Sequence, residues 1–146
     1  MIFEEMNLSD VQTYIQTGNV IFRDFEKDKL KLGKRIEKKL FEIINNEIKI
    51  SLFTLSGIDE IVNKKPYKYG EEGEKYKYDV IFLIEPLTAS EAMKEIKTRE
   101  GVDEVHEGNR VLYFKRLKEK ITQTYLTKII GTPVYKYMTL RNWNTT

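Results

Sequence analysis

The clearest periodic pattern in the chain lies at residues 26–46, where apolar residues recur at four-residue spacing. Lysine and arginine occupy the other side, so the pattern predicts an amphipathic helix that packs one face on a core. We expect this helix to end at Asn45-Asn46. The predicted apolar stripe consists of Leu32, Ile36, Leu40 and Ile44, widened by Phe41 and Ile43.

A second pattern, in which β-branched and aromatic residues alternate with polar ones, predicts strands. Residues 11–17 and 20–25 form one such pair around Gly18-Asn19, and glycine at the first central position is typical of a type II′ hairpin turn. Further strands are expected at 48–55, 78–85, 102–105, 110–117 and 134–140, and further helices at 1–8, 56–65, 88–98 and 122–130.

Residues 64–78 interrupt these patterns with two glycines, one proline and many lysines and glutamates. Such a composition is typical of a linker or a mobile loop. Ser56 is the expected N-cap of the helix before it. We therefore expect a first unit at residues 1–63, a linker at 64–77 and a second unit at 78–146.

The order of predicted elements repeats along the chain. When Gly18-Asn19 is aligned with Gly108-Asn109, five elements agree in order, and only the strand at 78–85 lacks a counterpart in the first unit. Strand-helix-strand-strand-helix-strand is the ferredoxin-like arrangement. The predicted fold class is α+β, with tandem ferredoxin-like (βαββαβ) units of which the first lacks its opening strand. We expect strand exchange or a homodimer to fill the open first sheet.

Composition narrows the function classes. Lys+Arg number 25 and Asp+Glu number 23, a net charge of +2, which argues against broad, charge-driven nucleic-acid binding. The absence of cysteine excludes disulfides, thiolate nucleophiles and iron–sulfur clusters. No apolar run approaches the roughly 20 residues that a membrane helix needs, and the N-terminus shows no signal-peptide pattern. We expect a cytoplasmic protein that does not contact a membrane.

Two motifs resemble those of a known family. Residues 13–22, Thr-Tyr-Ile-Gln-Thr-Gly-Asn-Val-Ile-Phe, are similar to the signature hairpin of the mostly bacterial domain of unknown function 1697 family, and residues 139–145, Thr-Leu-Arg-Asn-Trp-Asn-Thr, resemble its C-terminal signature. The resemblance implies a two-unit ferredoxin-like fold. It implies no reaction, because the family has no settled activity. Family members usually begin with a strand and a glycine-containing loop, which this sequence lacks.

Metal and cofactor chemistry finds little support in the sequence. His106 is the only histidine, and without cysteine a zinc site would need several carboxylates. Gly70 and Gly73 enclose two glutamates, and no Gly-Lys-Ser/Thr follows, so they form no phosphate-binding loop. The serines lie outside the pattern of a nucleophile elbow. We therefore predict no metal, no cofactor and no identifiable catalytic residue.

Tyrosines and lysines alternate within residues 64–78, a composition that is also found where proteins bind single-stranded nucleic acid. The neighbouring glutamates dilute the positive charge, however, and residues 110–115 lack the glycine-aromatic pattern of the ferredoxin-like RNA-binding modules. We therefore do not expect nucleic acid as a partner.

The remaining candidate site consists of polar and aromatic residues at the two motifs: Tyr14, Gln16, Asn19, Arg141, Asn142, Trp143 and Asn144. Arginine offers a planar fork for carboxylate or phosphate, asparagine and glutamine offer donors and acceptors, and tryptophan offers a stacking surface. If the two motifs meet in space, these residues suit a small polar or anionic ligand. The alternative is that the asparagines bond to backbone groups and Trp143 fills an interface.

The sequence thus favours a non-enzymatic module that binds a small polar or anionic ligand or another protein. One alternative is an enzyme that uses the same polar site without a metal or a thiol. The other is an RNA-associated protein, for which a positive stripe along a sheet face would be the distinguishing feature.

Overall fold

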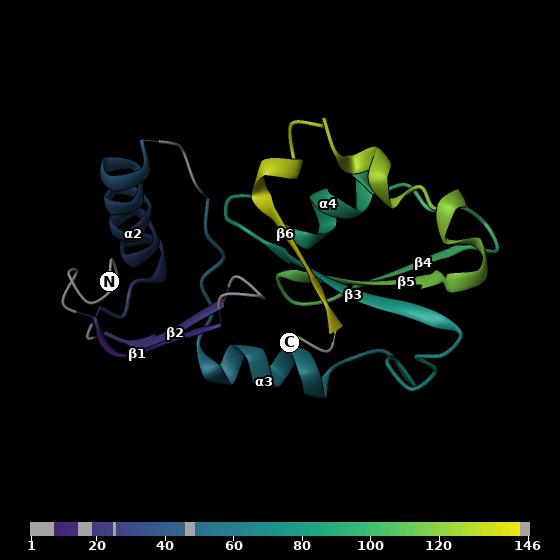
Figure 1. Cartoon of the computed structure of the whole chain (residues 1–146), viewed down its shortest axis with the longest axis horizontal. Coiled ribbons are helices and arrows are strands. Elements are labelled where there is room, and N and C mark those ends of the chain that lie inside the picture. Colours follow the sequence, from purple (N-terminus) through teal and green to yellow (C-terminus); the bar gives the residue numbers. More distant parts are fainter. Residues whose placement is uncertain (1–7, 15–18, 25, 46–48, 144–146) are drawn as a thin grey trace. The chain divides into compact units, whose positions relative to one another are not determined.

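The computed structural model describes residues 8–14, 19–24, 26–45 and 49–143, which divide into two compact units, 1–52 and 53–146 (Figure 1). The sequence places this boundary after residue 63. The structure places it earlier because helix α3 (Leu55–Asn63) belongs to the second unit, where Ile58 and Ile61 pack on its sheet.

The first unit contains a hairpin of β1 (Ser9–Tyr14) and β2 (Asn19–Arg23), which pair antiparallel. The predicted strand pair is therefore confirmed. Asn19 is not a turn residue, however, because its backbone lies opposite Tyr14 within the ladder. The helix predicted at residues 1–8 lies outside the described residues except for Leu8, which is buried.

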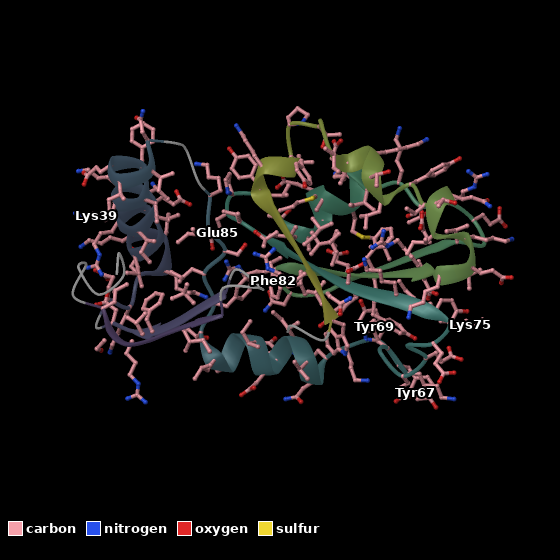
Figure 2. All side chains as sticks on the ribbon, in the orientation of Figure 1. Lys39, Tyr67, Tyr69, Lys75, Phe82 and Glu85 are labelled. Carbon is pink, nitrogen blue, oxygen red and sulfur yellow. The ribbon has the colours of Figure 1, made fainter. Side chains whose placement is uncertain are left out.

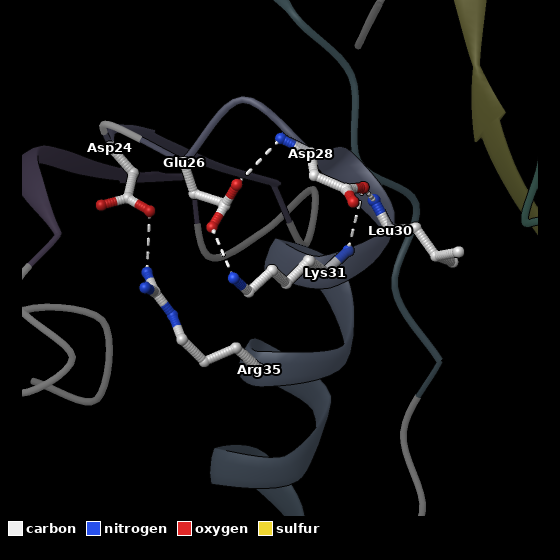
Figure 3. Close-up of polar contacts among 6 residues, drawn as sticks. All are labelled: Asp24, Glu26, Asp28, Leu30, Lys31 and Arg35. Carbon is white, nitrogen blue, oxygen red and sulfur yellow. Dashed lines mark hydrogen bonds and ion pairs between the residues drawn. The ribbon is translucent and has the colours of Figure 1, made fainter.

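Helix α2 (Lys29–Ile44) confirms the long amphipathic pattern. The Asp28 carboxylate accepts hydrogen bonds from the amides of Leu30 and Lys31 and caps the first turn (Figure 3). Asn45 ends the helix in the left-handed region, with φ of 57°. The core of the unit consists of Leu8, Leu32, Ile36 and Leu40, with Val11, Phe22, Ile50 and Leu52 packed against it. The apolar stripe is narrower than predicted, because Phe41, Ile43 and Ile44 are exposed.

The strand predicted at residues 48–55 is wrong for its described part, because residues 49–54 are irregular. Ile50 and Leu52 still reach the core, but the backbone amide of Ile50 donates to the Glu37 carboxylate at 3.1 Å instead of joining a ladder. The alignment of this segment with the last strand of the chain therefore fails. A homodimer through the first sheet stays a prediction.

The second unit is built on a four-stranded antiparallel sheet with the strand order β4-β5-β3-β6. The two central strands are β3 (Tyr76–Leu83) and β5 (Val111–Leu117). Residues 78–83 of β3 and 111–114 of β5 are buried, and for β3 the continuous apolar run 80–84 predicts this. The edge strands are β4 (Asp103–Glu107) and β6 (Met138–Asn142). Together with the helices, this sheet confirms the α+β class.

Both faces of this sheet are covered (Figure 1). One face packs against α4 (Ala89–Glu95), which Thr88 caps, and against the buried side chains of Leu126 and Ile129. The other face packs against α3 and the segment 64–75. Thr54, and not Ser56 as predicted, caps α3, because its hydroxyl accepts from the amide of Gly57 at 3.0 Å.

The helix predicted at residues 122–130 is wrong. Short 3-10 turns stand there: η2 (Lys118–Gln123) and η3 (Leu126–Ile129), followed by η4 (Tyr135–Tyr137) before β6. The Asp103 carboxylate accepts from the Thr124 hydroxyl and the Tyr125 amide, and the Thr124 hydroxyl accepts from the Leu126 amide. These side-chain acceptors occupy amides that an α-helix would use.

The segment 64–77 packs on the sheet and is not a free linker. Tyr69 is buried at 3% exposure, whereas Tyr67, two residues earlier, is 91% exposed and points away from the sheet (Figure 2). One aromatic side chain therefore anchors a segment whose glycine, lysine and glutamate content predicts a loop.

Candidate functional site

The predicted site residues fall into two groups that belong to different units. Tyr14 and Asn19 face each other as backbone partners at the end of the hairpin, while Gln16 lies outside the described residues. Arg141 and Asn142 end β6, Trp143 follows directly, and Asn144 lies outside the described residues. The approach of the two groups stays a prediction, so the described site is the C-terminal one.

Trp143 forms part of an aromatic cluster on the α3 face of the sheet. Its ring lies 5.1 Å from that of Tyr69 and 6.4 Å from that of Tyr113, in edge-to-face arrangements. Gly70 closes the cluster: its φ is +87°, and a Cβ there would lie 2.7 Å from the indole nitrogen of Trp143. Only glycine fits both the conformation and the space. Trp143 therefore fills an interface between the sheet and the segment 64–75.

Two tyrosine hydroxyls lock this cluster to the backbone. The Tyr69 hydroxyl donates to the carbonyl of Asp79 at 2.5 Å and lies 3.2 Å from that of Phe114. The Tyr113 hydroxyl donates to the carbonyl of Ile61 at 2.5 Å, which ties α3 to the sheet. Burial raises the pKa of both phenols above the ordinary value. Both therefore stay neutral donors at physiological pH, which suits a structural role and not phenolate chemistry.

Arg141 lies on the same face of the sheet as this cluster, because it is paired in the ladder with Val80, whose side chain belongs to the same core. Its side chain is half-buried next to Val80, its partner in the ladder. One guanidinium nitrogen, Nη1, donates to the carbonyl of Leu140 at 2.8 Å. Its Nε is buried and meets no acceptor in the described part of the chain.

The other arginines of the second unit each have a partner for the guanidinium charge. Arg116 forms an ion pair with Asp79 at 2.6 Å. Arg99 lies 5.3 Å from the ring centre of Tyr125, and Arg110 lies 4.5 Å from that of Phe53. Across the described residues, Arg141 has neither a carboxylate within ion-pair distance nor a ring beneath it. Its charge is the least compensated of the four.

Asn142 is exposed on the opposite face of β6 from Arg141, opposite Asp79 in the ladder. It therefore does not join Arg141 in one set of ligand donors on the strand itself. Of the predicted residues, the described structure brings Arg141 and Trp143 onto one face and separates Asn142 from them.

A charged cluster on β4 and β5 provides a second polar region. Glu104 accepts from Lys115 at 3.0 Å and contacts the His106 ring at 2.7 Å, and the Lys115 ammonium lies 4.2 Å from the ring centre of Tyr76. The hydrogen bond from Lys115 lowers the pKa of Glu104. Although desolvation alone favours the neutral amine, the hydrogen bond and charge of Glu104 raise the pKa of Lys115.

Metal binding gains no support from this cluster. Throughout the described ranges, no three histidine, cysteine, aspartate or glutamate side chains converge as metal ligands. The same ranges contain no helix that is long and apolar enough to cross a membrane.

The sequence analysis did not identify Tyr69 and Gly70, the residues that pack against Trp143 beside Arg141. Tyr69 and Gly70 stand in the segment predicted as a linker, and the carbonyls that Tyr69 contacts lie 10 and 45 residues away. The only signal in the sequence that points to Tyr69 is the alternation of tyrosine and lysine in this segment. The alternation does not show which ring is buried, because Tyr69 is buried and Tyr67 is exposed.

Two comparisons with known proteins are informative, one about the family and the other about the fold. The family described as "Protein of unknown function (DUF1697)" matches residues 1–113. A solved structure, that of the conserved bacterial protein SP0830 from Streptococcus pneumoniae, matches with a TM-score of 0.83 at 20% identity, over 98% of this chain and 79% of that chain. None of the curated proteins is a significant match. Residues 139–145 lie beyond the family match, so their likeness to its C-terminal signature stays a prediction.

Proposed function

Since this chain belongs to the DUF1697 family of proteins of unknown function, we propose a function from its own chemistry: it is a non-enzymatic module that binds a small anionic ligand through Arg141. The anionic ligand is one that the sequence analysis also expects. The proposed binding site is smaller than the one expected from the sequence, because it contains only Arg141 at the end of β6. Carboxylates and phosphates are the ligands that a guanidinium binds with its planar fork.

The observation that carries the proposal is the uncompensated guanidinium of Arg141. Its half-buried position lowers the competition from water, and its Nε has no acceptor in the described structure. A buried donor without an acceptor costs about 1–3 kcal/mol, which an anion bound to the Nε and Nη fork would recover. Arg116 also has a buried Nε without an acceptor, but its charge is paired with Asp79. Arg99 and Arg110 lie over aromatic rings, so Arg141 differs from all three in having no partner for its charge in the described structure.

The neighbouring aromatic cluster supports the proposal by holding β6 in place. Trp143 is anchored against Tyr69 two residues beyond Arg141, so the backbone that carries the guanidinium is fixed before a ligand arrives. A preorganised side chain loses less entropy on binding than a free one.

We also propose that the two units are ferredoxin-like and arranged in tandem. Support comes from the second unit, in which strand, helix, strand, strand, 3-10 turns and strand follow in that order with antiparallel neighbours. The hairpin and helix of the first unit supply part of the same order. Deleting residues 1–52 tests whether the second unit folds by itself, as a separate ferredoxin-like unit should. The remaining chain should keep the circular dichroism spectrum of a folded protein and unfold cooperatively, and an unfolded product would contradict the proposal.

The ligand proposal can be tested with the fluorescence of Trp143, the only tryptophan in the chain. Inorganic phosphate, acetate and a nucleoside monophosphate are titrated against the full chain. We expect a saturable change with at least one anion, abolished in Arg141→Gln and kept in the matched control Arg99→Gln. An equal response in both variants, or no response to any of these anions in the wild type, would overturn the proposal.

A further inference from the structure

Helix α2 carries a positive strip that the proposed function does not use. Lys31, Lys34 and Lys38 are exposed and follow one another along one side of the helix, and Phe41 continues the line by one turn. We call these four residues the α2 strip. Leu32, Ile36 and Leu40 occupy the core-facing side, so the strip belongs to the face that the first unit leaves in solvent.

Charge is segregated onto this helix. Residues 29–44 contain six basic and two acidic side chains, whereas residues 1–52 as a whole contain nine of each. The near-neutral balance of the chain therefore hides a local net charge of +4. An open hollow of about 340 Å³ lies at the strip and is lined by Lys31, Lys34, Arg35 and Lys38 together with Glu26 and Leu32.

Only part of this charge is compensated. Arg35 contacts the Asp24 carboxylate at 2.8 Å, and Lys31 lies 3.6 Å from that of Glu26 (Figure 3). Within the described ranges, Lys34 and Lys38 have no carboxylate at ion-pair distance. They stand four residues apart, where like charges repel each other and destabilise a helix.

The placement along the helix adds to the positive potential. The first turn of α2 contains lysines, which the helix dipole disfavours, and the Asp28 carboxylate at the N-cap offsets only part of their charge. Such an arrangement costs stability in the free protein and is offset when negative charge binds. The lysines from Lys31 to Lys38 span about 10 Å along the axis, at a rise of about 1.5 Å per residue. This length exceeds a single phosphate and suits a chain of them.

The exposed ring of Phe41 indicates which class of polyanion the α2 strip binds. Its ring is 52% exposed and lies one turn beyond Lys38 on the strip. Cations that follow a phosphate backbone, together with an exposed aromatic ring for a base, are the combination by which proteins hold single strands. We infer that the α2 strip binds single-stranded nucleic acid, with Lys31, Lys34 and Lys38 at the phosphates and Phe41 stacked on a base.

The test is fluorescence anisotropy with the full chain and a labelled oligouridylate of about 12 nucleotides, a length within the range of single-strand sites. The wild type should bind at about 50 mM salt, and affinity should fall steeply with salt. Lys34→Gln/Lys38→Gln should weaken binding about tenfold and reduce the salt slope by about 1.4, at about 0.7 per phosphate contact. Phe41→Ala should weaken binding with little change in that slope.

Matched controls separate this surface from general charge effects. Lys94→Gln/Lys97→Gln removes two exposed lysines from and just beyond α4 and should leave binding unchanged. Circular dichroism confirms that each variant is folded. No binding by the wild type, or equal loss in both lysine pairs, would overturn the inference. Two results would overturn the assignment to single strands. One is that a duplex binds as tightly as the oligouridylate and Phe41→Ala has no effect on binding. The other is that polyglutamate of equal charge displaces the oligouridylate.

Discussion

Arg116 and Arg141 are both half-buried on the four-stranded sheet, on opposite faces, and they differ in whether a carboxylate neutralises the guanidinium charge. On the α4 face, Arg116 meets the buried carboxylate of Asp79 at 2.6 Å. On the α3 face, Arg141 donates to the carbonyl of Leu140 and meets no carboxylate among the described residues. Each has a buried Nε without an acceptor, so what separates them is charge compensation. A compensated arginine fixes the fold, while an uncompensated one keeps a charge that a ligand can use.

The largest effect is expected at the compensated site. Asp79→Ala leaves the Arg116 guanidinium buried without its counter-charge and should lower the free energy of unfolding by about 3–5 kcal/mol. Urea unfolding followed by circular dichroism measures the loss. Asp79→Leu/Arg116→Met removes both charges and should recover most of the stability. A single variant as stable as the wild type would show that the ion pair is not what holds Arg116.

The next effect concerns the packing that fixes β6. Gly70→Ala combines a positive φ with a Cβ that would lie 2.7 Å from the Trp143 indole, and it should cost about 1–3 kcal/mol. Gly73→Ala is the matched control, because no atom lies within 4 Å of a Cβ there. We expect a changed Trp143 emission in the first variant alone. Equal stability of both variants would show that Trp143 is not packed on this segment.

A smaller effect on stability is expected at the uncompensated site. Arg141→Ala removes no ion pair in the described structure and should cost about 1 kcal/mol or less, through lost packing of its stem and one hydrogen bond. The anion response of Trp143 should disappear in the same variant. If this substitution unfolds the protein, Arg141 is a structural residue like Arg116, and the contrast between the two sites is lost.

The smallest effect belongs to the exposed cluster on β4 and β5. Because Lys115 lowers the pKa of Glu104, the carboxylate stabilises the fold above the ordinary glutamate pKa, and this contribution is lost as the pH falls through the lowered value. The carboxylate is half-exposed, so solvent screening limits it to about 0.5 kcal/mol. Melting temperatures of the wild type and Glu104→Gln should differ at pH 7 and converge in acid. A constant difference across this range would contradict the assignment.

The elements that the sequence predicts well are those whose pattern depends on local burial. The stripe Leu32, Ile36 and Leu40 predicts α2, and the apolar run at 80–84 predicts β3, because burial repeats with the period of each element. The missing helix at 122–130 shows the limit. There a distant residue, Asp103, accepts from the Tyr125 amide and the Thr124 hydroxyl in a segment that would otherwise suit a helix.

The candidate site shows the same limit more strongly. Arg141 and Trp143 are visible in the sequence as a polar and aromatic motif, but their surroundings are not. The contacts of Trp143 with Tyr69 and Gly70 cross more than 70 residues of chain, and the pairing of Arg116 with Asp79 crosses 37. Whether Arg116 or Arg141 has a carboxylate nearby depends on how β3 pairs with its neighbouring strands, and the sequence does not show this pairing.

The most direct test of the contrast is the NMR signal of the arginine side chains in the ¹⁵N-labelled protein. The Nε–H resonances of Arg116 and Arg141 are assigned with Arg116→Lys and Arg141→Lys, and the anion with the strongest Trp143 response is titrated. We expect the Arg141 resonance to shift with saturation at the same anion concentration as the fluorescence, and the Arg116 resonance to stay in place. An unmoved Arg141 resonance, or equal shifts of both, would contradict the account.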